Sequence, residues 1–207
     1  MILTKAKQKL AFILLAVTFI YLTVFSLLRD PVHNTISMTG LEYPVGFALL
    51  CILLFTTFLS NFAVMFYHHG YTNVLVRCMA AFGSFCIVIT AFFPTSKEGE
   101  GLKYFVHGTA AILFFALTML SMLLFLFSKR QEGGVYRILL GGLILTAAAF
   151  GIITFLLFIV WRQRYGRTGL TEIIAIDYMF AVFFVDTLIR RKETREKEGR
   201  LCGEASV

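Results

Sequence analysis

Asp177 and His107 are the best-placed side chains for chemistry, because each lies inside a long apolar stretch. Asp177 comes seven residues after Leu170, where the last apolar stretch begins, a depth of about 10 Å along a helix. A carboxylate at that depth in a membrane has to be protonated, hydrogen-bonded or paired across helices. His107 lies at a similar depth in another stretch, and Tyr104 and Tyr178 are near the same level.

Three interpretations of this pair are open. His107 and Asp177 can form a structural hydrogen bond that fixes helix packing, bind a ligand or handle a proton, or belong to a metal or catalytic site. Glu172 stands at the start of the same stretch as Asp177 and is also a candidate ligand-binding residue. An acid in the first turn of a helix is equally favoured by the helix dipole, without any ligand.

Three arginines form the second unusual group. Arg162, Arg164 and Arg167 lie in one short segment, together with Trp161 and Tyr165. Guanidinium groups bind phosphate and carboxylate groups through paired hydrogen bonds, and Trp and Tyr are typical of the membrane interface. The segment therefore fits an anionic headgroup of the outer leaflet, or it pairs with acidic residues of neighbouring loops.

Other polar residues have simpler interpretations. Asp186 precedes Arg190 by four residues, so the two can pair on one helix and reach the interface. His68 and His69 fall in a short predicted loop, and we expect both to be solvated. The polar residues of the second apolar stretch are expected to form hydrogen bonds between helices: Thr56, Thr57, Ser60 and Asn61.

The composition shows what kind of element must hold these residues. Of 207 residues, 58% are hydrophobic and only 15% are charged, and the mean hydropathy is +0.82. A soluble domain has about 45–50% apolar and about 25% charged residues, so this chain has too little polar surface to cover a soluble globule. A soluble enzyme, a disordered protein and a nucleic-acid-binding module are excluded, and no nucleic-acid partner is expected.

Six apolar stretches are long enough to cross a membrane, since about 30 Å of hydrocarbon requires roughly 20 mainly apolar residues in a helix. They are continuous rather than alternating, which excludes barrel strands. We predict an all-α integral membrane protein, a bundle of six transmembrane helices over residues 1–189 with a basic cytoplasmic tail at 190–207. The predicted spans are about 10–28, 43–66, 74–93, 104–127, 138–161 and 170–189.

The fifth stretch contains a run of small residues, which let helices approach closely or leave room for a ligand groove. They are Gly141, Gly142, Ala147, Ala148, Ala149 and Gly151.

The distribution of basic residues predicts the orientation. Thirteen of the 19 Lys and Arg residues fall at the N-terminus, in the second and fourth connections and in the C-terminal tail, and six fall in the other connections. Because Lys and Arg are enriched in short cytoplasmic loops, we predict that both termini are cytoplasmic. We expect a multi-pass protein of the bacterial plasma membrane, whose net charge of +7 mostly faces anionic lipid of the inner leaflet.

Recognised catalytic signatures are missing from the sequence. The four cysteines lie within spans or on the predicted cytoplasmic side, where disulfides do not persist. No His/Cys spacing resembles a zinc or iron–sulfur motif, and no Ser–His–Asp order, HExxH, P-loop or dinucleotide pattern is present. We therefore predict no metal and no cofactor, and an enzyme is not the favoured interpretation.

Three short motifs carry a resemblance to a known family. The predicted first outer loop contains Ser37 and Gly40 in a Ser-x-x-Gly pattern, the third span ends in a Phe-Pro pair at Pro94, and the fourth begins with His107 and Gly108. With these motifs, over nearly the whole chain, the sequence resembles the bacterial six-span membrane family catalogued as domain of unknown function nine-nine-eight. A more distant resemblance is to eukaryotic six-span membrane proteins of the autophagy-modulator and GPI-remodelling-associated type. The resemblance implies six spans but no activity, because the closer family has no settled one.

These observations favour a membrane protein that binds, or moves, a lipid or another amphiphile through a polar pocket in the outer leaflet. The expected partners are membrane lipids, a small amphiphilic ligand, and further copies of the chain or a partner membrane subunit. The candidate ligand-binding residues are His107, Asp177, Glu172, Tyr104, Tyr178, Arg162, Arg164 and Arg167.

Three alternatives remain open. The chain can be a substrate-binding subunit of a multicomponent importer, or a membrane assembly or immunity protein without a ligand. It can also be an intramembrane enzyme in which His107 is the general base and Asp177 orients it.

Overall fold

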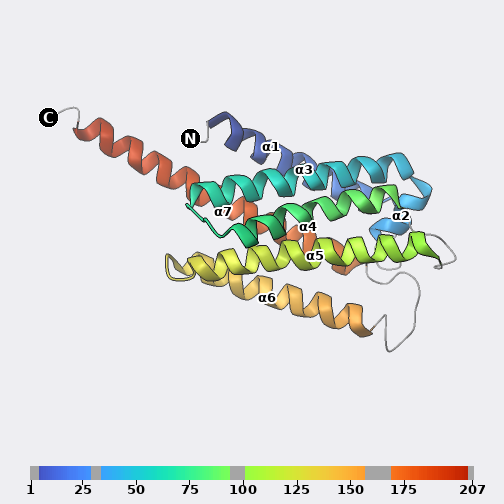
Figure 1. Ribbon diagram of the computed structural model, residues 1–207. Helices are drawn as coiled ribbons and strands as arrows, with labels where there is room; N and C mark the ends of the chain where they lie inside the picture. The colour runs from blue at the N-terminus through green and yellow to red at the C-terminus, as the bar shows by residue number, and fades with distance from the viewer. Residues whose placement is uncertain (1–4, 29–33, 94–100, 157–168, 205–207) are drawn as a thin grey trace.

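The computed structural model describes residues 5–28, 34–93, 101–156 and 169–204, and all of the regular structure in these ranges is helical (Figure 1). The six apolar stretches largely coincide with six long helices, and a seventh, short helix lies where the sequence suggested a loop. The helices are α1 Lys5–Ser26, α2 Ile36–Glu42, α3 Pro44–His68, α4 Val74–Phe92, α5 Leu102–Lys129, α6 Gly134–Phe155 and α7 Gly169–Glu204.

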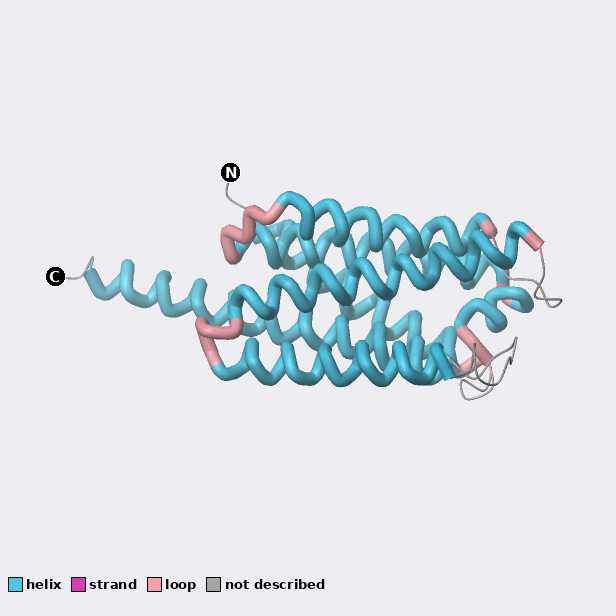
Figure 2. The backbone as a smooth tube through the Cα atoms, turned by 60° about the horizontal axis from the view of Figure 1, so that its bottom comes forward, coloured by secondary structure: helices cyan, strands magenta, loops and turns pink. Residues whose placement is uncertain are grey.

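The long helices lie side by side in an elongated bundle (Figures 1 and 2). Helix α4 packs between α3 and α5, α6 contacts α5 and α7, and α7 also contacts α1 and α3. Both chain ends lie at one end of the bundle, which we call the terminal end, and α2 lies at the opposite end, which we call the α2 end (Figure 1).

Five helices of the described chain are long and apolar enough to cross a membrane: α1, α3, α4, α5 from Phe105, and α6. Helix α7 is not among them, because its apolar half contains three carboxylates, those of Glu172, Asp177 and Asp186. The described chain is therefore all-helical, as predicted, and its five long apolar helices fit a membrane protein. Helix α7 continues without a break to Glu204, through the segment expected as a tail.

Local sequence accounts for where several helices begin. The Thr35 hydroxyl accepts a hydrogen bond from the backbone N–H of Met38 and caps α2. Pro44 stands in the first turn of α3, where its missing N–H costs nothing. Asn73 caps α4 in the same way as Thr35 caps α2. Gly70, with φ of +60°, supplies the left-handed residue of the turn between α3 and α4.

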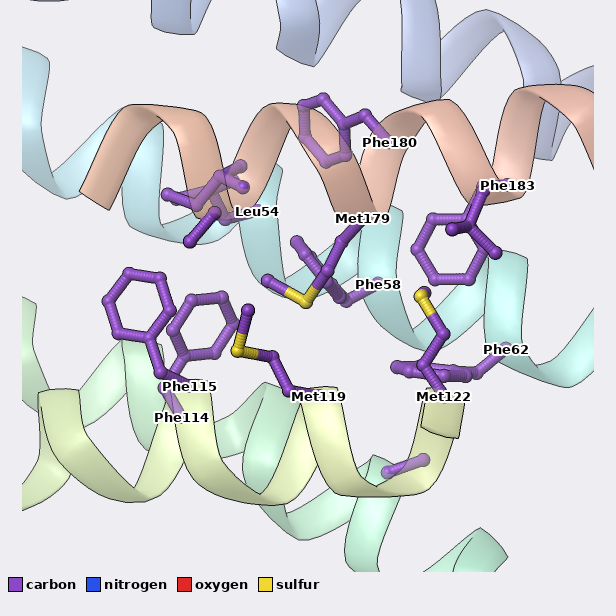
Figure 3. Packing of buried hydrophobic residues seen from close by; sticks show 14 of the residues in the cluster. Leu54, Phe58, Phe62, Phe114, Phe115, Met119, Met122, Met179, Phe180 and Phe183 are labelled. Atoms are coloured by element: carbon purple, nitrogen blue, oxygen red, sulfur yellow. The ribbon is translucent and has the colours of Figure 1, made fainter. Parts of the chain in front are cut away.

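Aromatic rings and methionines fill the core between α3, α5 and α7 (Figure 3). Phe58 is fully buried and lies in ring contact with Phe114, with centroids 5.2 Å apart, and with Phe183, at 5.6 Å. The side chains of Met122 and Met179, both fully buried, fill the remaining space. In a membrane such close packing, rather than exclusion of water, is what holds helices together.

Hydrogen bonds from α3 also attach it to α1. The hydroxyls of Thr18 and Thr57 are 2.6 Å apart and fully buried, and the Asn61 amide donates to the carbonyl of Ala11 at 3.2 Å. The prediction of bonds between helices is confirmed for Thr57 and Asn61. The hydroxyls of the other two residues bond within α3 itself: Thr56 and Ser60.

The small residues of α6 permit a close approach at one glycine. A Cβ on Gly142 would overlap the Tyr178 hydroxyl, which donates to the carbonyl of Leu139 at 3.0 Å. Gly141 and Gly151 have open space where a Cβ would stand. Close helix packing is therefore confirmed at Gly142 and not at the other two glycines.

Candidate polar site at the α2 end

The side chain of His107 connects three elements at the α2 end. Its Nε2 lies 2.8 Å from Oγ of Ser37, on α2. Its Nδ1 lies 2.8 Å from the carbonyl oxygen of Phe93 and 3.3 Å from that of Thr90, at the end of α4. His107 itself stands in the second turn of α5. We call these four residues the α2 junction.

The partners of the imidazole determine where its proton lies. Carbonyl oxygens can only accept hydrogen bonds, so Nδ1 of His107 carries a hydrogen and donates it to Phe93. In the neutral ring, Nε2 is then an acceptor, and the Ser37 hydroxyl donates to it. The α2 junction thus aims the lone pair of a neutral histidine at a serine hydroxyl.

The start of α2 is fixed by bonds on both sides of Ser37. The Thr35 hydroxyl accepts from the N–H of Met38 at 3.1 Å, which closes the first turn. The N–H of Ile36 donates to Oε2 of Glu172, on α7, at 3.2 Å. Glu172, a candidate ligand-binding residue, therefore helps to hold the backbone next to Ser37.

Gly40 brings α2 close to α3. A Cβ at this position would come within 2.5 Å of the Phe47 ring, so only glycine fits without displacing that ring. The Phe47 ring in turn lies against the His107 ring, with centroids 6.4 Å apart. Helix α2 is thus attached to α3, α5 and α7.

Ser37 and His107 differ in exposure. His107 is only 5% exposed, whereas Ser37 is half-buried. Ser37 is therefore the more accessible residue of the pair. A hydroxyl oxygen has two lone pairs, so Ser37 can also accept a hydrogen bond while it donates to His107.

Asp177 is not part of the α2 junction. The hydrogen bonds of His107 go to Ser37, Thr90 and Phe93, and Oδ1 of Asp177 is buried without a hydrogen-bond partner among the described residues. The hydrogen bond considered between His107 and Asp177 is therefore not found in the described part of the chain.

The remaining sequence candidates divide into two groups. Tyr178 faces α6 through its bond to Leu139, and Gly108 has open space around the position of a Cβ. The others lie outside the described residues: Pro94, Arg162, Arg164, Arg167 and the side chain of Tyr104.

A second polar cluster, which we call the terminal cluster, lies near the terminal end. Nε2 of His69 is 2.8 Å from Oδ1 of Asp186 and 3.3 Å from the Tyr136 hydroxyl. The other oxygen of Asp186 accepts from Nε of Arg190 at 2.8 Å, and Arg190 also donates to the Thr187 hydroxyl. The cluster joins the end of α3 to the first turn of α6 and the middle of α7.

The terminal cluster corrects two expectations. His69 is not solvated, because its side chain is only 6% exposed. Asp186 and Arg190 pair as predicted, but they are 1% and 4% exposed and do not extend to the interface. These groups are buried because α7 packs against α3 and α6, and the side chain of His69 reaches both Asp186 and Tyr136. Contacts between helices far apart in sequence have no local signal. His68 is 20% exposed and pairs with Glu193 at 3.1 Å.

A groove of about 240 Å³ lies between α3 and α4, towards the terminal end. Its walls are mostly apolar, and one basic side chain stands among them. The lining residues are Leu59, Phe62, Ala63, Phe66, Tyr67, Arg77, Ala80 and Ala81. Within the described ranges, no group of three or more His, Cys, Asp or Glu side chains is arranged to hold a metal ion.

A family model described as a protein of unknown function, DUF998, matches residues 10–187. The chain belongs to this family. The match confirms the resemblance found from the Ser37, Pro94 and His107 motifs, and the more distant resemblance to eukaryotic proteins stays a prediction. No curated protein and no solved structure matches this DUF998 protein.

The motifs that suggested DUF998 meet in space at the α2 junction. Ser37 and His107 are hydrogen-bonded, and Gly40 is the close contact of α2 with α3. Sequence reasoning singled out Ser37 only as part of a motif. Its bond to His107 spans 70 residues, a separation at which spacing alone gives no information about contact.

Proposed function

We propose that this DUF998 protein binds a lipid or a related amphiphile at the α2 end, with Ser37 as the polar contact and His107 as the buried residue that positions its hydroxyl. One observation carries the proposal: a half-buried serine, backed by a buried histidine, stands at the α2 end of a bundle whose exposed side chains are largely apolar. Ligand sites typically combine apolar walls with a few fixed polar groups.

The depth of the site supports an amphiphile in particular. His107 lies two residues inside the apolar part of α5, which begins at Phe105. A molecule held there has its polar part at the membrane boundary and its apolar part beside the helices. Lipids have a polar headgroup and apolar chains, whereas small soluble metabolites lack the apolar part.

We further propose that the α2 end faces the outside of the cell membrane, with α7 as a sixth span. The basic residues support this orientation, because most of them lie at the terminal end, and Lys and Arg are enriched on the cytoplasmic side. With this orientation the site belongs to the outer leaflet.

The test is to purify the full chain from bacterial membranes in a mild detergent and to quantify co-purified lipids by mass spectrometry after extraction. Wild type is expected to retain one class of amphiphile in a near-constant ratio to protein. Ser37→Ala and His107→Gln each remove one hydrogen-bond partner, which should lower retention about 2- to 10-fold.

Asp177→Asn is the matched control, since Asp177 lies on a spanning helix but outside the α2 junction. It should retain the amphiphile as wild type does. Equal retention by wild type, Ser37→Ala and His107→Gln would overturn the proposal. Loss in Asp177→Asn alone would restore the site first considered from the sequence.

A further inference from the structure

We propose that Ser37 is a nucleophile and His107 its general base, and that the pair transfers or hydrolyses the acyl group of an ester-linked lipid. This inference rests on the proposed function, because the substrate is an amphiphile held at the α2 junction. It adds a chemical step to binding.

The geometry matches the requirements for an activated serine. A weakly nucleophilic hydroxyl needs a base within about 2.6–3.2 Å and a third group that orients the base. Ser37 Oγ is 2.8 Å from Nε2 of His107, and the Phe93 carbonyl accepts from Nδ1 at 2.8 Å. The carbonyl takes the part that a carboxylate plays in a Ser–His–Asp triad, since it fixes the ring and its tautomer.

Both partners are held in place before any substrate arrives. The second carbonyl near Nδ1, that of Thr90, restricts rotation of the His107 ring. Ser37 is held through the backbone next to it, where Ile36 donates to Glu172. Ser37 is only half-buried, as the accessibility of a nucleophile requires. Catalytic groups work best when supporting contacts lock them in this way.

The depth of Ser37 and His107 in the membrane indicates which class of substrate they can reach. Acyl esters of membrane lipids lie at the boundary between the hydrocarbon and the headgroups, and His107 stands at the start of the apolar part of α5. A lipid ester beside the bundle can therefore present its carbonyl carbon to Ser37 without leaving the membrane.

The reaction balances with the groups present and one acceptor alcohol or water. Ser37 Oγ attacks the ester carbonyl carbon and its proton passes to Nε2 of His107, while the carbonyl oxygen takes the negative charge. The bond to the leaving alcohol breaks, and His107 gives its proton to that alcohol. A second alcohol or water then attacks the carbonyl carbon of acyl-Ser37 and passes its proton to Nε2 of His107. The bond from this carbon to Ser37 Oγ breaks, and His107 returns the proton to Oγ, so that both residues are restored.

A fluorophosphonate probe tests this step, because such probes phosphorylate activated serines. The full chain in lipid nanodiscs is treated with the probe, digested, and the modified peptide is identified by mass spectrometry. We expect a single modified serine, Ser37. Ser37→Ala should abolish labelling, and His107→Gln should slow it by about 100-fold or more.

Ser60→Ala is the matched control, since Ser60 is also half-buried but bonds only to the carbonyl of Thr57. It should label like wild type. Ser37→Cys guards against loss of folding, because its thiol should still be acylated by an activated thioester or p-nitrophenyl ester. Absence of probe from Ser37 in folded wild type, or equal labelling in His107→Gln, would overturn the inference. Retention of lipid in the same unlabelled sample would leave the binding proposal standing, so the two failures can be told apart.

Discussion

Gly40 and Gly108 both belong to the short motifs of the sequence, yet they have different surroundings. The position of a Cβ on Gly40 is occupied by the Phe47 ring, at 2.5 Å, whereas Gly108 has nothing within 4 Å. The first glycine is therefore required by packing, because a larger residue would push α2 away from α3. The second has no such requirement from the described residues.

Substitution of each glycine by alanine tests this difference. Gly40→Ala should lower the free energy of unfolding by about 1–3 kcal/mol, the usual cost of overpacking. Gly108→Ala should leave the melting temperature unchanged or raise it, because alanine favours a helix more than glycine does. Melting curves in detergent measure both, and equal losses in the two variants would contradict the packing argument.

Asp177 has a buried carboxylate oxygen that the surrounding residues of the described chain do not stabilise. Its Oδ1 is buried and has no hydrogen-bond partner among the described residues, and a buried polar atom without a partner costs stability. Asp177→Leu should therefore keep or raise the melting temperature. A clear drop would mean that Asp177 holds a group that the described part of the chain does not contain.

At the scale of elements, the terminal cluster joins three helices through buried charges. Asp186 accepts from both His69 and Arg190, so it is the centre of the cluster. Removal of one partner from a buried ion pair leaves the other charge without compensation. The cluster therefore fixes how α7 meets α3 and α6.

Asp186→Asn should destabilise the protein by about 3–5 kcal/mol, because Arg190 is left buried and unpaired. The double variant with Asp186→Leu and Arg190→Leu should lose less stability than Asp186→Asn does, since neither charge of the pair remains buried. Thermal or denaturant unfolding in the same detergent compares the two. A double variant that is less stable than Asp186→Asn would contradict the role of the pair.

The helices follow from the sequence more directly than their contacts do. Continuous apolar runs of about 20 residues predict long helices, because in a membrane only helices and closed barrels satisfy their backbone, and barrel strands would alternate. Helix α2 was not expected, because it has only seven residues and lies in a polar connection, where the Thr35 cap is the one local signal. The Ser37–His107 bond and the burial of His69 depend on helix packing, which spacing in the sequence does not determine.

At the scale of the whole molecule, α7 decides the topology. With α7 as a sixth span, both termini lie on the same side of the membrane; with five spans, they lie on opposite sides. The three carboxylates of its apolar half make α7 the least apolar of the long helices. Glu172 bonds to the backbone of α2 and Asp186 lies in the terminal cluster, so two of the three have partners within the bundle.

Single cysteines can test the topology in intact cells, after replacement of the four native ones. An impermeant maleimide should label Lys103→Cys, at the α2 end, and should not label Lys7→Cys or Glu196→Cys until the membrane is permeabilised. Labelling of Glu196→Cys in intact cells would contradict six spans with cytoplasmic termini.

Native mass spectrometry of the full chain in mild detergent is the decisive test for a lipid site at the α2 junction. We expect one amphiphile bound per chain in wild type and in Asp177→Asn, and a depleted adduct in His107→Gln. An adduct that survives equally in all three, or a wild-type protein with none, would contradict a lipid site at the α2 junction.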